Sequence, residues 1–99
     1  MTQTIQVLGY EYKLIEDGDA DTMGAYGRYH AKSSTMQLAS DLSQVQREST
    51  VLHEIIEAIN YHLQLELSHA TIMALESTLY GSLKANGVNL TPLAPAKEP

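Results

Sequence analysis

Cysteine is absent from this 99-residue chain, and basic residues are few. Without cysteine the protein has neither a disulfide framework nor a thiolate zinc site, so a metal ion must be held by His, Asp or Glu. Six Lys and Arg residues stand against twelve Asp and Glu residues, for a formal net charge of −6. Nucleic-acid affinity comes mainly from clustered basic side chains. The scattered bases of this chain therefore argue against DNA or RNA as a partner.

Signals for export and membrane insertion are missing as well. Residues 1–7 contain neither the basic stretch nor the apolar stretch of a secretion signal. No apolar run approaches the roughly 18 residues that a membrane-spanning helix needs. We therefore expect a soluble, cytoplasmic protein. Its length suits one small domain with a single core, for which a hydrophobic fraction of 43% is sufficient.

The first 40 residues have the alternating pattern of β-strands. Residues 4–15 change parity at Gly9, which indicates either one kinked strand or a short hairpin. An acidic stretch, residues 16–21, reads as a solvated turn. Residues 29–31 and 35–39 flank a short polar turn, which is typical of a second hairpin. This half of the chain predicts a small antiparallel sheet of about three strands.

The rest of the chain predicts two helices. Ser43 and Gln46 have the spacing of a capping box ahead of a helical pattern over residues 44–65. Ser68 caps a second helix over residues 69–84, which stops at an Asn-Gly pair. The apolar stripe of this second helix consists of Ile72, Leu75, Leu79 and Leu83.

Strands followed by a helical hairpin define an α+β fold. Residues 1–87 are expected to form one domain. Residues 88–99 contain all three prolines, so we expect them to form an extended or mobile tail.

The first helix carries a pattern suited to metal chemistry. His53 and Glu57 are four residues apart and therefore lie nearly above one another on the helix surface. Such a pair presets two ligand directions for one ion. Glu54 follows His53 and is the candidate general base. Taken alone, this pattern is common by chance, because acids on a helix face usually just meet solvent.

A third ligand must come from elsewhere in the chain, where the candidates are few. His69 stands at the start of the second helix and Glu76 about 10 Å further along, so the two can hardly bind one ion. We favour His69, because it completes a His₂Glu donor set, as in hydrolytic zinc enzymes, and keep Glu76 in reserve. Asn60 is a candidate to brace a ligand through its amide. Tyr61 and Tyr80 are candidates to stabilise an oxyanion, and nothing in the sequence selects between them.

The motif and its surroundings resemble small zinc metallopeptidases of phages and prophages, which are minimal zincins. The resemblance rests on RESTVLHEIIEAIN at residues 47–60, on LELSH at residues 65–69 and on the preceding hairpin with Gly27 and Tyr29. It covers residues 24–82. It implies a cytoplasmic protein of a phage or its bacterial host that hydrolyses peptide bonds.

Carried onto this sequence, the resemblance implies His53 as the first ligand and Glu54 as the catalytic acid and base. It also implies a third ligand from the second helix or its approach, which agrees with His69. The second histidine of the usual motif is Glu57 here. Because a carboxylate suits harder ions, manganese and iron stay open beside zinc. The alternatives are a non-catalytic structural or interaction protein of the same fold, with or without metal, and a small acidic inhibitor of a host protein.

Overall fold

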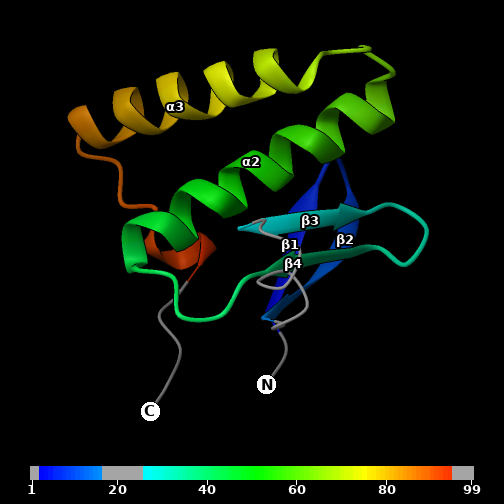
Figure 1. The fold of residues 1–99 in the computed structure, drawn as a ribbon, viewed down its shortest axis with the longest axis horizontal. Coiled ribbons are helices and arrows are strands. Elements are labelled where there is room, and N and C mark those ends of the chain that lie inside the picture. The colour runs from blue at the N-terminus through cyan, green and yellow to red at the C-terminus, as the bar shows by residue number, and fades with distance from the viewer. Residues whose placement is uncertain (1–2, 17–25, 95–99) are drawn as a thin grey trace.

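The computed structural model describes residues 3–16 and 26–94 of the chain (Figure 1). Four strands come first, then two long helices and a short 3₁₀ helix. Their bounds are β1 Gln3–Val7, β2 Tyr10–Glu16, β3 Gly27–His30, β4 Thr35–Leu38, α2 Gln44–Leu63, α3 His69–Ala85 and η1 Thr91–Leu93. The predicted α+β class is confirmed. Most of the predicted acidic turn, residues 17–21, lies outside the described residues.

Two hairpins form the sheet, and for residues 4–15 the structure decides in favour of a hairpin over a kinked strand. Strands β1 and β2 are antiparallel and joined by Leu8 and Gly9, whose φ angles of 53° and 83° are both positive. A two-residue hairpin turn of this kind requires positive φ at both positions, which explains the glycine. The change of parity at Gly9 therefore marks a turn between two strands, and Ile5, Val7 and Leu14 all face the core.

The sheet has four strands in the order β1-β2-β4-β3, and its central pair is parallel. Each hairpin is antiparallel within itself, as expected. The parallel pair arises because the hairpins meet through β2 and β4, a long-range pairing that no local pattern specifies. Strand β3 is consequently an edge strand, and it lies beside α2 (Figure 1).

Helix α2 is the middle layer: the sheet covers one side of it and α3 the other (Figure 1). The larger core lies between α2 and the sheet. Its buried members are Ile5, Val7, Tyr12, Leu14, Met36, Leu38, Val51, Ala58 and Ala94. The smaller core lies between the helices and contains Leu52, Ile56 and Ile72. Because α2 is covered on both sides, it buries polar as well as apolar side chains, among them Arg47, Glu48, Thr50 and Glu54.

The caps of both helices follow the sequence signals. The Ser43 hydroxyl accepts a hydrogen bond from the Gln46 amide, and the Gln46 side chain accepts one from the Ser43 amide. Helix α2 ends at Leu63, and Gln64 adopts a left-handed conformation that turns the chain back. Ser68 caps α3 by accepting from the Thr71 amide.

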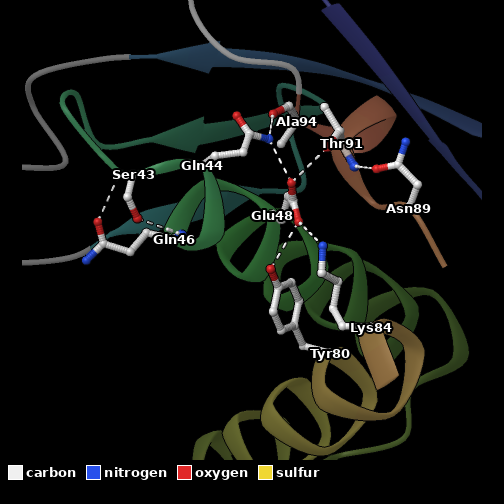
Figure 2. A network of polar contacts seen from close by, with 9 residues as sticks. All are labelled: Ser43, Gln44, Gln46, Glu48, Tyr80, Lys84, Asn89, Thr91 and Ala94. Atoms are coloured by element: carbon white, nitrogen blue, oxygen red, sulfur yellow. Dashed lines mark hydrogen bonds and ion pairs between the residues drawn. The ribbon is translucent and has the colours of Figure 1, made fainter. Parts of the chain in front are cut away.

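A buried carboxylate ties α2, α3 and the C-terminal segment together (Figure 2). Glu48 is 2% exposed. It accepts hydrogen bonds from Gln44, Tyr80 and Thr91, and the Lys84 ammonium lies 3.6 Å away. Burial by itself raises the pKa of Glu48, but these hydrogen bonds and the lysine outweigh it and lower the pKa. We call this set the Glu48 network.

Part of the expected tail belongs to the folded domain. Residues 91–93 form η1, and its neighbours Leu90 and Ala94 are buried. The Ala94 carbonyl accepts a hydrogen bond from Gln44, and the Leu93 carbonyl accepts one from Gln3. Residues 90–94 are therefore packed, contrary to the expectation of an extended or mobile tail, because two apolar side chains complete the core under α2. Residues 95–99 lie outside the described residues.

Neither α2 nor α3 has the length and hydropathy of a membrane span, and no other described helix does.

Candidate metal centre

The candidate ligands of the first helix lie on one side of α2, between its two buried faces. His53 Nε2 is 3.5 Å from Glu57 Oε2. Both side chains are largely covered, with exposed fractions of 14% for His53 and 28% for Glu57. The spacing of four residues thus produces the adjacent imidazole and carboxylate that the sequence predicts.

His69 reaches the same place because the connection between the helices is short and held at both ends. The Asn60 side chain accepts a hydrogen bond from the Leu67 amide at 2.9 Å, and Ser68 caps the first turn of α3. The His69 ring then lies edge-on to the His53 ring, with centroids 5.5 Å apart. Asn60 therefore braces the connection that positions His69, and its amide contacts backbone here, which differs from the expected contact with a ligand side chain.

Donor atoms of His53, Glu57 and His69 all lie within 4.8 Å of one another. Two ligands bound to zinc at about 2.1 Å with tetrahedral angles are about 3.4 Å apart. The His53–Glu57 separation of 3.5 Å already matches that value. His69 is exposed, so its ring has room to turn through the remaining distance. The donor set of two imidazoles and one carboxylate therefore suits a zinc ion in chemistry, and its atoms lie close enough together to be candidates for one.

Glu76, the reserve ligand, lies on the opposite nitrogen of His53. Its Oε1 is 2.8 Å from His53 Nδ1, and its other oxygen accepts a hydrogen bond from the Ser49 hydroxyl. An ionised carboxylate only accepts hydrogen bonds, so Nδ1 must carry the proton in this contact. In a neutral imidazole, Nε2 then has its lone pair free on the side of Glu57 and His69.

Glu54 is buried beside the ligand cluster, with an exposed fraction of 3%. Burial, followed by the negative charges of Glu57 and Glu76, raises its pKa from 4.5 to about 8. A Cβ atom at Gly27 would lie 3.1 Å from Glu54 Oε2 and only 2.6 Å from Thr50 Cγ2. The absence of a side chain at position 27 is therefore what lets β3 approach α2 next to the carboxylate.

His53, Glu54, His69 and Glu76 line one cleft of about 430 Å³ between the β3 edge, α2 and α3, whereas Glu57 is not among its lining residues. Its lining residues are Tyr26, Gly27, Thr50, His53, Glu54, His69, Met73 and Glu76. The sequence singled out four of them. It missed the contributions of Tyr26, Gly27 and Thr50, since the approach of β3 to α2 is a tertiary contact. Met73, which also lines the cleft, is 51% exposed.

Two tyrosines predicted as oxyanion donors lie elsewhere. The Tyr80 hydroxyl donates to Glu48, one turn of α3 beyond Glu76. Tyr61 is 57% exposed and its ring packs edge-on against Tyr29. Neither is among the residues that line the cleft.

A second polar cluster that the sequence did not indicate lies between the sheet and the end of α2. The buried Tyr12 hydroxyl is hydrogen-bonded to the Tyr29 hydroxyl at 2.7 Å and to His62 Nε2. Burial and the hydrogen bond with Tyr12 raise the pKa of Tyr29. The Tyr10 ring stacks on His62 with centroids 3.9 Å apart. The cluster fastens the first hairpin to the last turn of α2.

Comparison with known proteins gives no match: no family model, curated protein or solved structure is significantly similar to this chain. Functional assignment therefore depends on the chemistry of the cleft.

Proposed function

We propose that the protein is a metal-dependent peptidase of the minimal zincin type, with His53, Glu57 and His69 holding a zinc ion and Glu54 acting as general base. Phage or prophage origin and a cytoplasmic peptide or protein substrate belong to the same proposal, through the resemblance. Manganese and iron are the alternative ions, because one of the three ligands is a carboxylate.

One observation carries the proposal: His53, Glu57 and His69 each offer a donor atom, and these atoms lie within 4.8 Å of one another. With Nδ1–H donated to Glu76, the lone pair of His53 Nε2 and the Glu57 carboxylate are 3.5 Å apart. A proton or a cation must occupy that space for the arrangement to be stable. Glu76 brings a further carboxylate to the cleft, Glu54 adds negative charge once it loses its proton above its raised pKa of about 8, and the described residues that line the cleft include no Lys or Arg. This excess of negative charge favours a divalent cation over a single proton.

When bound, a zinc ion supplies Lewis acidity, which acidifies water and polarises a carbonyl group, and positive charge, which offsets the surrounding carboxylates. Ionised Glu54 accepts the proton of the attacking water and passes it to the nitrogen of the departing amine. The burial of Glu54 keeps bulk water away from this carboxylate, which makes it a stronger base once it is ionised. The open side of the cleft, beside the exposed Met73, admits the peptide.

The test separates metal binding from catalysis. Protein purified without chelator is analysed for bound metals and assayed for cleavage of casein, an unstructured protein substrate. We expect one zinc per chain. The Glu54→Gln variant should keep the metal and lose about 100- to 10,000-fold in kcat, the usual contribution of a general base. His53→Ala should lose both metal and activity. Glu11→Gln removes an exposed carboxylate from β2 and serves as the matched control.

Full activity of Glu54→Gln would disprove the general-base role. A metal-loaded wild type that cleaves nothing, and whose melting temperature falls on chelation, would support the structural alternative. Absence of metal from every preparation, including one reconstituted with zinc, would reject the metal centre itself.

A further inference from the structure

We infer that Glu76 is a positioning residue for His53 rather than a metal ligand: its carboxylate holds the imidazole in the tautomer whose free nitrogen faces Glu57 and His69. The inference deepens the proposed metal centre and rests on it for the effect on metal affinity. The tautomer itself is a property of the metal-free chain and is measured without metal.

Glu76 is held at both oxygens. Oε1 accepts from His53 Nδ1 at 2.8 Å, and Oε2 accepts from the Ser49 hydroxyl. Both partners lie on α2, four residues apart, and Glu76 crosses to them from α3. The carboxylate is 20% exposed and the imidazole 14%, so water competes little for this hydrogen bond. The contact therefore fixes the plane of the ring as well as the site of its proton.

The next turn of α3 also helps to fix the position of α3 along α2, which we call its register. Tyr80, four residues after Glu76, donates to the buried Glu48, which precedes Ser49 on α2. Two successive polar contacts thus set how far α3 slides along α2. Because His69 is seven residues before Glu76 on the same helix, this register also decides whether His69 reaches the ligand cluster.

The geometry disfavours Glu76 as a ligand. An ion shared with Glu57 must lie on the Nε2 side of the His53 ring, because Glu57 Oε2 is 3.5 Å from Nε2. Glu76 occupies the Nδ1 side of that ring. A rigid planar imidazole separates the two positions, so Glu76 cannot reach the ion without first releasing Nδ1.

The test is ¹⁵N NMR of the histidine side chains in metal-free protein above about pH 8, where an ordinary imidazole is neutral. Free histidine favours the tautomer with the proton on Nε2. We expect His53 to show the reverse, with Nδ1 protonated and Nε2 bare. Glu76→Gln keeps an acceptor oxygen and should keep this tautomer, whereas Glu76→Leu removes the acceptor and should return His53 toward the ordinary preference. Glu11→Gln is the control for loss of one negative charge.

Zinc affinity, measured by competition with a chromophoric chelator, gives the second readout. Loss of a residue that orients a ligand typically weakens metal binding 10- to 100-fold. We expect a loss of about that size for Glu76→Leu and a larger loss for His69→Ala.

A wild-type His53 protonated on Nε2, or on both nitrogens, would overturn the inference, and so would retention of the Nδ1–H tautomer in Glu76→Leu. Equal losses of zinc affinity in Glu76→Leu and His69→Ala, or no loss in His69→Ala, would make Glu76 a ligand. If wild-type protein binds no zinc, the proposed function fails, and the NMR result alone decides the role of Glu76.

Discussion

The raised pKa of Glu54 predicts that the metal-free protein becomes less stable as the pH rises. The folded state holds a proton on Glu54 up to about pH 8, whereas an exposed glutamate releases it near 4.5. Between these values the folded state binds more protons than the unfolded state, so the free energy of unfolding decreases with pH. The contribution of protonated Glu54 is fully present below about pH 4.5 and is lost as the pH passes 8.

The size of the effect follows from the same interval. At about 1.36 kcal/mol per unit of pKa, the change from 4.5 to about 8 corresponds to roughly 5 kcal/mol. Small domains have total stabilities of about 5–15 kcal/mol, so the loss is a large fraction of the whole. Glu54→Gln replaces the carboxyl by an amide that does not ionise. The variant should match wild type at pH 5 and exceed it by several kcal/mol at pH 9.

Urea unfolding in chelator-containing buffers between pH 5 and pH 9 measures this difference. All other titratable groups are common to both proteins, so the difference between wild type and variant isolates Glu54. If the free energies of unfolding of wild type and Glu54→Gln fell in parallel with pH, the reasoning would be refuted, because the group that titrates would then not be Glu54. Excess zinc at pH 8 should restore wild-type stability, because a ligand that binds only the folded state stabilises it.

Two further perturbations test how the cleft is held together. Glu48→Ala leaves buried donors unpaired and should cost about 3–5 kcal/mol of unfolding free energy. The lowered pKa of Glu48 means that its contribution is present at neutral pH and disappears as the pH falls through the folded-state pKa, which unfolding curves at neutral and acidic pH will show. Gly27→Ala places a Cβ 2.6 Å from Thr50 Cγ2 and 2.9 Å from the Gln37 carbonyl, and should cost about 1–3 kcal/mol. Its control, Gly81→Ala, meets nothing within 4 Å on a helix and should stabilise by about 1 kcal/mol; equal effects of the two alanines would contradict the packing at Gly27.

Local signals predicted most of the fold. The capping box at Ser43, the change of parity at Gly9 and the periodicity of both helices depend on neighbours within a few residues, and each is visible in the sequence. At Gly9 the sequence still left a kinked strand and a hairpin open. The parallel pairing of β2 with β4 and the packing of residues 90–94 depend on partners far along the chain, so they were not predicted.

The apolar stripe of α3 shows most clearly where prediction from local periodicity fails. Periodicity predicts that Leu75 and Leu79 face the core, yet they are 38% and 41% exposed. The face of α3 that meets α2 instead carries Ile72, Glu76 and Tyr80. Polar side chains on α2, among them Glu48 and His53, require polar partners once they are buried. Because Glu48 and His53 need polar partners, α3 presents Tyr80 and Glu76 to α2 in place of Leu75 and Leu79.

The candidate site also has one part that follows from local sequence and one part that depends on tertiary packing. The spacing of His53 and Glu57 is a property of one helix, so the sequence alone places them together. The sequence favoured His69 over Glu76 from the donor set alone, whereas the register of α3 against α2, which places both side chains, is a tertiary property. That register follows from buried hydrogen bonds, of which Glu76 to His53 is one. Glu76 looked like an alternative ligand. By accepting a hydrogen bond from His53 Nδ1, it instead helps to set the position of α3 along α2 and thereby brings His69 close to His53.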